Sequence, residues 1–253
     1  MVSKSFGQIK GPFVVWLFVV TYFAIPILFG GSSKGTLPQE ITVSLVLNLL
    51  IAMALGWGRI LVFLVIFLAL WERRRSLREI FCSVGLKRKG AVKSVFWSIV
   101  ITPLFLVLIG VMVMMFNYFL GPMPTLVSDN GQIPLWFLYY MIVSSFFPVA
   151  VVEEAIARGY ILDRLVPKHP SSLVKALPAI LLGSLLFTLY HLPSYLGLYS
   201  FSAPWAVALL AGNVFPWSVG LSIAYVRART RNIIGPVLIH FLADSMPIIL
   251  MLV

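Results

Sequence analysis

The sequence predicts an all-α protein, a polytopic transmembrane bundle of about seven helices. The 253 residues are 60% hydrophobic and only 11% charged, whereas a soluble domain carries about 25% charged residues. Mean hydropathy is +1.02. The hydrophobic residues also run in stretches long enough for membrane spans, which need about 20 residues each.

We expect spans at about residues 12–30, 41–71, 94–120, 133–157, 173–192, 204–226 and 232–253. The first is longer than the usual apolar core of a signal peptide, so we interpret it as a retained anchor. The second could form two short spans. We favour one long, tilted or kinked helix, because a split would move the basic segment that follows to the wrong side of the membrane.

The basic residues predict the orientation of these spans. Lys4 and Lys10 precede the first span, eight basic residues lie between Arg73 and Lys93, and further groups follow the fourth and sixth spans. The alternate loops carry only Lys34. This pattern places the N-terminus inside and the C-terminus outside. The net charge of +11 therefore indicates membrane topology, and we expect no nucleic-acid partner.

Five ionisable residues interrupt the apolar stretches: Glu153, Glu154, His191, His240 and Asp244. A charge inside a bilayer costs several kcal/mol, so such residues persist where they face a protein interior or a wet cavity. Because they come from three separate spans, they could meet in one cavity. We interpret them as a water-activating catalytic site.

The two glutamates are expected to differ in role. Glu154 and Arg158 stand four residues apart on one helix face, where Arg158 can hold the carboxylate ionised and oriented. Glu153 points elsewhere and has no partner nearby in the sequence, so partial burial would suit it to work as a general base. The alternative is that both acids simply mark a helix end among cytoplasmic charges.

The histidines also have neighbours at helical spacing. Phe187 shares a face with His191 and could form the floor of a pocket, whereas His240 shares a face with Asp244, which could accept a ring N–H and fix the tautomer. The alternatives are structural: His191 as a polar tip at an interface, and the second pair as a buried lock for the last helix.

Metal binding is a further alternative at this stage. Carboxylates and imidazoles are zinc ligands, but the chain has no H-E-x-x-H motif, and its single cysteine, Cys82, excludes a thiolate cluster. We therefore expect no cofactor and do not favour zinc.

Three short motifs resemble those of a known family. They are Glu153-Glu154-x-x-x-Arg158, Phe187-x-x-x-His191 and His240-x-x-x-Asp244. Their order is similar to that of the CPBP family, the CAAX-processing and bacteriocin-processing membrane proteases, which includes the type II CAAX prenyl endopeptidase. The resemblance covers residues 133–253, so we expect one domain over 1–253 in which helices at 12–120 are accessory to this catalytic core.

The resemblance implies an intramembrane endopeptidase of the glutamate type. Glu153 and His191 would activate water, His240 and Asp244 would stabilise the oxyanion, and Glu154 and Arg158 would shape the site. Asp244 departs from the commoner Asn. The substrate would be a prenylated C-terminal peptide, a leader peptide or another membrane-associated tail, with the lipid bilayer as the other partner.

Two other classes of protein remain open. One is a non-catalytic scaffold or bacteriocin-immunity protein of the same fold. The other is a transporter with a proton relay, which we disfavour because the sequence has no repeated halves. A geometric question also remains open. Glu153 lies near the cytoplasmic end of its span and His191 near the far end of the next. They can meet only if that helix begins well outside the bilayer or a wet cavity reaches deep into the bundle.

Overall fold

The computed structural model describes residues 10–21, 43–120, 149–166, 173–198 and 205–250. This part of the chain is helical with short turns and no strand, which confirms the all-α class. A helix at residues 10–21 comes first. It is followed by α2 (Val43–Trp71), α3 (Leu77–Ser83), α4 (Ala91–Leu120), α6 (Val151–Glu154), the π-helix η2 (Ala155–Leu162), α7 (Asp163–Leu165), α8 (Leu173–Leu198), α9 (Trp205–Thr230) and α10 (Ile234–Leu250).

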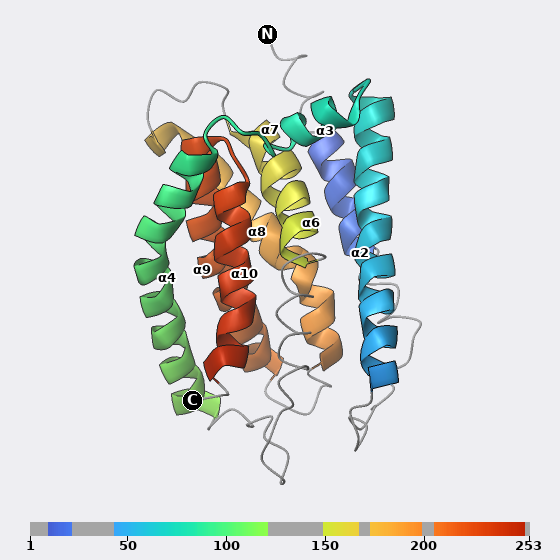
Figure 1. Ribbon diagram of the computed structural model, residues 1–253. Helices are drawn as coiled ribbons and strands as arrows, with labels where there is room; N and C mark the ends of the chain where they lie inside the picture. Colours follow the sequence, from blue (N-terminus) through green and yellow to red (C-terminus); the bar gives the residue numbers. More distant parts are fainter. Residues whose placement is uncertain (1–9, 22–42, 121–148, 167–172, 199–204, 251–253) are drawn as a thin grey trace.

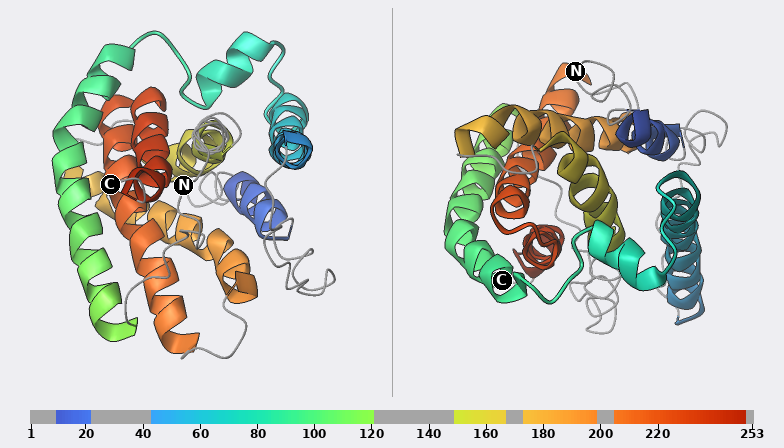
Figure 2. Two further views of the ribbon diagram at one scale, coloured as in Figure 1. Left: turned by 60° about the horizontal axis from the view of Figure 1, so that its bottom comes forward. Right: turned by 90° about the horizontal axis from the view of Figure 1, so that it is seen from above.

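The long helices run alongside one another as a bundle (Figure 1). On one side α9 packs against α8, α4 and α10. On the other side stand α2 and the helix at residues 10–21, and the α6–η2 segment lies between the two groups (Figure 2, right). Because helices surround it, every residue of η2 is buried.

An apolar core fixes the α6–η2 segment against α2. Ile60, Leu64 and Phe67 of α2 belong to one buried cluster with Ile156 and Tyr160 of η2. The ring of Phe67 meets that of Tyr160 edge-on, with centroids 5.6 Å apart. With one face of η2 filled by apolar packing, Arg158 extends from another face toward Phe187 of α8.

The start of α10 is held by hydrogen bonds from distant segments. Asn232 donates from Nδ2 to the carbonyl of Lys87 at 2.6 Å and accepts from the amide of Ile234 at 2.9 Å. The amide of Gly235 donates to Oγ of Ser94 at 3.0 Å. A Cβ at Gly235 would lie 2.5 Å from the Ser94 carbonyl oxygen, so glycine permits this close approach. These contacts fix the helix that carries His240.

Several expected segments can be compared with the helices. The stretch 41–71 is one continuous helix over its described residues, α2, so the alternative of two short spans is wrong. The stretches 94–120, 173–192, 204–226 and 232–253 correspond to α4, α8, α9 and α10. Residues 22–30 and 133–148 lie outside the described part. The sequence pattern did not predict α3 or η2.

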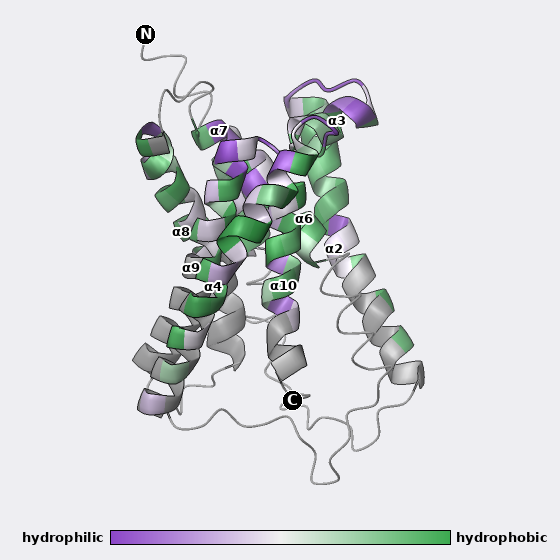
Figure 3. Cartoon of the chain, turned by 60° about the vertical axis from the view of Figure 1, so that its left-hand side comes forward, coloured by the Kyte–Doolittle hydropathy of each residue, from purple (hydrophilic) through white to green (hydrophobic). Residues whose placement is uncertain are grey.

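Hydrophilic residues gather at one end of the bundle. Figure 3 shows them around α3 and α7, whereas the described parts of the long helices are largely hydrophobic. Within the described residues, no helix combines the length and apolarity needed to cross a bilayer.

Candidate active site

Two adjacent carboxylates are buried where α6 passes into η2. Glu153 is 4% exposed and Glu154 is fully buried. Ionised carboxylates are rarely so deep unless they are paired, so their neighbours decide what they can do. The backbone here changes from α-helical to π-helical bonding, an arrangement often found at functional sites.

Glu154 is paired with Arg158, as the spacing predicted. Nη1 of Arg158 donates to Oε1 of Glu154 at 2.8 Å, and the arginine is 1% exposed. The Arg158 guanidinium lies flat over the ring of Phe187, with Cζ 3.7 Å from the ring centroid. Gly220 of α9 permits this packing, because a Cβ there would lie 3.1 Å from Nη2 of Arg158.

His240 completes the group from α10. Its Nδ1 lies 2.8 Å from Oε1 of Glu154, and its Nε2 lies 3.5 Å from Asp244 Oδ2 and 3.8 Å from Glu153 Oε2. The ring also meets Phe187 edge-on, at 5.8 Å between centroids. Both ring nitrogens therefore face carboxylates, and only the doubly protonated ring can donate on both sides.

These contacts bring together the predicted residues Glu153, Glu154, Arg158, Phe187, His240 and Asp244. His191 lies on α8, but its side chain is outside the described part of the chain. The role of Asp244 in fixing the His240 tautomer stays a prediction. The short contact of the His240 ring is with Glu154, and Asp244 stands farther away, on the other nitrogen. The spacing between Asp244 and His240 could not reveal this, because Glu154 comes from another helix.

The segment that carries these residues matches a protein-family model. Residues 134–246 match the model described as "Type II CAAX prenyl endopeptidase Rce1-like". Over this segment, a little under half of the chain, the protein is similar to the Rce1-like family. The Rce1-like family is a family of CAAX proteases. No curated protein and no solved structure matched the chain.

Within the Rce1-like segment, several buried polar atoms have no hydrogen-bond partner in the described part of the chain. They are Oε2 of Glu154, Nε and Nη2 of Arg158, Nη1 of Arg227, and Oγ of Ser184 and Ser245. Each such atom costs about 1–3 kcal/mol, so several beside one another are uncommon away from functional sites. Sequence reasoning missed Ser184 and Gly220, which lie in apolar stretches and carry no charge to mark them.

The metal question can be put to the same residues. In the described residues, no group of three or more His, Cys, Asp or Glu side chains is arranged to hold a metal ion. The expectation that zinc is not favoured remains a prediction, and a chelator tests it.

Proposed function

We propose that the chain is an intramembrane endopeptidase in which Glu153 activates water for attack on a peptide bond. The main support is one observation: the His240 imidazole lies among the carboxylates of Glu153, Glu154 and Asp244, buried in the protease-family segment. Peptide hydrolysis requires a base beside a hydrogen-bond donor, and this arrangement supports these roles for Glu153 and His240.

In the proposed reaction, the Glu153 carboxylate takes a proton as the water oxygen bonds to the scissile carbonyl carbon. His240 donates from Nε2 to the resulting oxyanion. Collapse of the tetrahedral intermediate breaks the C–N bond, and Glu153 returns its proton to the leaving amine. Glu154, held by Arg158, accepts from Nδ1 and keeps the ring in position.

His191 is proposed to assist Glu153, and the helix register supports this role. A Cβ on Gly183 of α8 would meet the side chain of Leu162, and Phe187 meets Arg158 four residues earlier in η2. The two segments are therefore antiparallel. Four residues further along α8 and four residues back along η2 and α6, the same register would bring the backbone at position 191 beside Glu154. The two motifs would then lie at the same depth in the membrane.

We also propose that the protein is a multi-pass membrane protein with about seven spans, its N-terminus inside and its C-terminus outside. Large apolar side chains are exposed along α2 and α4, including Leu70 at 76%, Val92 at 85% and Ile99 at 67%. A lipid environment would cover them. The substrate class follows from the family: a prenylated CAAX peptide or another lipidated, membrane-associated tail.

The test is cleavage of a prenylated CAAX peptide by the purified protein in detergent. Wild type should cut it, whereas Glu153→Gln and His191→Gln should be inactive yet as thermostable as wild type. A parallel assay with chelator should keep full activity. If wild type is inert on prenylated and leader peptides alike, the scaffold or immunity-type alternative is favoured. If either variant cuts normally, the proposed mechanism is wrong.

A further inference from the structure

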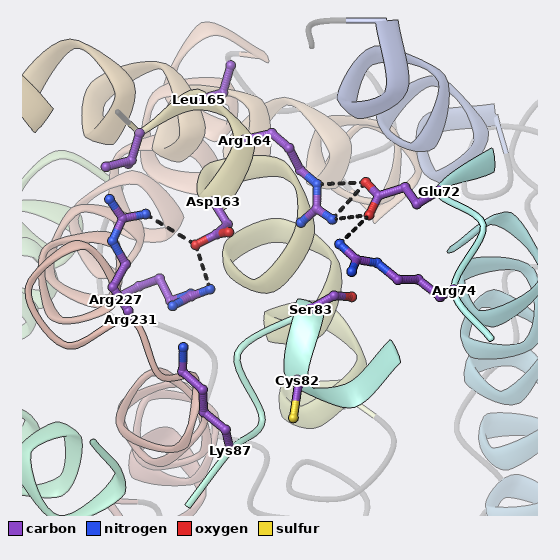
Figure 4. Close-up of a pocket in the computed structure, with 11 residues that line it drawn as sticks. Glu72, Arg74, Cys82, Ser83, Lys87, Asp163, Arg164, Leu165, Arg227 and Arg231 are labelled. Atoms are coloured by element: carbon purple, nitrogen blue, oxygen red, sulfur yellow. Dashed lines mark hydrogen bonds and ion pairs between the residues drawn. The ribbon is translucent and has the colours of Figure 1, made fainter. Parts of the chain in front are cut away.

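A cavity of about 650 Å³ lies at the hydrophilic end of the bundle, separate from the catalytic group. Its walls come from the end of α2, from α3 and the loop after it, from α7 and from the end of α9 (Figure 4). Five basic and two acidic side chains line it, which leaves a formal surplus of three positive charges, five minus two.

Both acids are already held by arginines. Arg164 binds the two carboxylate oxygens of Glu72 at 2.7 and 2.6 Å, and Arg74 approaches the same carboxylate at 3.4 Å. Asp163 accepts from Arg227 at 2.8 Å and from Arg231 at 3.2 Å. Neither carboxylate is left over to neutralise another cation.

Among the described residues that line the cavity there is no third carboxylate to balance the remaining positive charge. Lys87 extends toward Arg231 (Figure 4), and no ion pair of its ammonium with a described residue is found. Arg227 is 3% exposed, and its Nη1 has no hydrogen-bond partner among the described residues. Burial lowers the pKa of Arg227 to about 10, although the nearby Asp163 carboxylate raises it, so the guanidinium stays charged at neutral pH. Like charges gathered in this way are stabilised by a bound anion.

One of these cations is held at a conformational cost. Arg231 has φ of 55°, the left-handed region that residues other than glycine rarely adopt. It follows directly after α9, where glycine is the usual residue. The arginine there brings a guanidinium to the cavity wall that glycine could not supply.

Apolar side chains stand next to the cavity and indicate the source of the anion. Trp71, Phe81 and Leu86 are 39–56% exposed, and each directly precedes a lining residue in the sequence. A free phosphate would gain nothing from them. Acyl chains would cover them while a phosphate entered the cavity, as basic and aromatic residues do at membrane surfaces.

We propose that this cavity binds the phosphate headgroup of an anionic phospholipid. Arg231 and Lys87 provide the accessible charges, and the buried Arg227 fixes the position of Asp163 behind them. The inference requires the protein to meet a membrane but not to cleave a peptide.

The test measures thermal unfolding of the full chain in neutral detergent. Dioleoyl phosphatidylglycerol is titrated into the micelles, with dioleoyl phosphatidylcholine as the zwitterionic control. Inorganic phosphate at matched ionic strength forms a third arm. A ligand that binds the native state raises the unfolding midpoint with its concentration. We expect phosphatidylglycerol alone to raise the wild-type midpoint and saturate.

Three variants locate the site. Lys87→Met and Arg231→Gly should each raise the half-saturating lipid fraction about fivefold. Arg231→Gly also removes the strain of a positive φ, so the unfolding midpoint of this variant without lipid should not fall. If it then fails to respond to phosphatidylglycerol, misfolding is not the cause. Arg88→Met is the matched control, since Arg88 is exposed in the same loop but does not line the cavity.

Three results would overturn the proposal. The first is an equal response to phosphatidylcholine. The second is a full response to inorganic phosphate alone, which would assign the cavity to a soluble anion. The third is an equal loss in Arg88→Met and Lys87→Met, which would indicate diffuse surface charge. Because no arm measures cleavage, a failed protease assignment leaves this test unaffected.

Discussion

At the residue scale, Arg158 connects most of the candidate site. Its guanidinium pairs with Glu154 and lies over Phe187, while its backbone carbonyl accepts from Nε of Arg227 at 3.1 Å. It thereby touches α8 and α9 as well as its own helix. A buried pair of this kind is more costly to break than to replace as a whole, because removal of one member leaves the other charge uncompensated.

Arg158→Ala should therefore lose about 3–5 kcal/mol of unfolding free energy, reduced to the extent that His240 compensates Glu154. The measurement is thermal or denaturant unfolding in detergent. Arg229→Ala is the matched control on α9, where the exposed arginine has no ion pair with a described residue and lies over Trp97 in a cation–π contact at 4.5 Å. Equal stability of the two variants would show that the Glu154 pair contributes little.

Asp244 gives a prediction about catalysis. Its Oδ2 stands 3.5 Å from Nε2 of His240, on the side of the ring that faces Glu153. Asn in its place keeps the shape and gains an amide donor, so Asp244→Asn should remain active. Asp244→Ala should lose about 10²–10³ in turnover, the usual cost of dismantling one oxyanion contact. An inactive Asn variant, or an unchanged rate for Ala, would restrict Asp244 to packing α10.

Local spacing predicted some contacts of the site and missed others for a physical reason. Glu154 and Arg158 are four residues apart, so helix geometry alone brings them together. The contact between Glu154 and His240 joins residues 86 apart in sequence. It depends on which helices adjoin, and periodicity contains no such information. The sequence pattern also gives no sign of the role of Gly220, because this glycine acts by lacking a side chain where Arg158 packs.

At the element scale, η2 is the main departure from a regular bundle. It follows α6 without a break and carries Arg158 between the buried acids Glu153 and Glu154 and the cavity residue Asp163. Gly159 allows it to pass close to the loop after α3. A Cβ there would lie 2.5 Å from the carbonyl oxygen of Val84, which is backbone and cannot turn aside.

Gly159→Ala should thus destabilise the protein by about 1–3 kcal/mol, the range for overpacked sites. Gly58→Ala on α2 is the control, since a Cβ there meets nothing within 4 Å. That change should stabilise by about 0.5–1 kcal/mol through helix propensity. Unfolding midpoints of both variants in detergent measure the difference, and the same sign for both would contradict the close approach.

Hydropathy predicted where the long helices lie, but it did not predict η2 or α3. The helix α4 begins at Ala91, three residues before the expected start at 94. The agreement is close because the span was located from a continuous apolar run, and that run forms most of the helix. A π-helix leaves the composition unchanged and only alters which carbonyl each amide meets, so nothing in the apolar pattern indicates it. The helix α3 lies in a basic segment too short for a span, where its cap, Ser76 accepting from the Glu79 amide, was the available signal.

At the scale of the whole molecule, the cavity and the catalytic group are linked by a short chain of contacts. Arg227 binds Asp163 in the cavity wall through Nη2 and the Arg158 carbonyl through Nε. Arg158 in turn pairs with Glu154, which contacts His240. The end of α9 thus touches both regions, so their relative positions depend on one side chain.

The orientation of the molecule gives a further prediction, since the basic cavity end is expected on the cytoplasmic side. Cys82 is the only cysteine of the chain, and it is exposed in the cavity wall. A membrane-impermeant maleimide should label it in inside-out vesicles and leave it unlabelled in intact cells. Cys82→Ser should abolish labelling in both. Labelling of intact cells would reverse the proposed topology.

The same thiol makes the protein its own reporter. Because the chain has no other cysteine, one alkylation rate can be followed on the protein after it is isolated from labelled membranes, without engineered labels. A headgroup seated beside Lys87 would shield Cys82 across the cavity, so the rate would slow as that place fills. Labelling of this one thiol would then report both the side of the membrane on which the cavity lies and the fraction of cavities that hold a headgroup, without any change to the sequence.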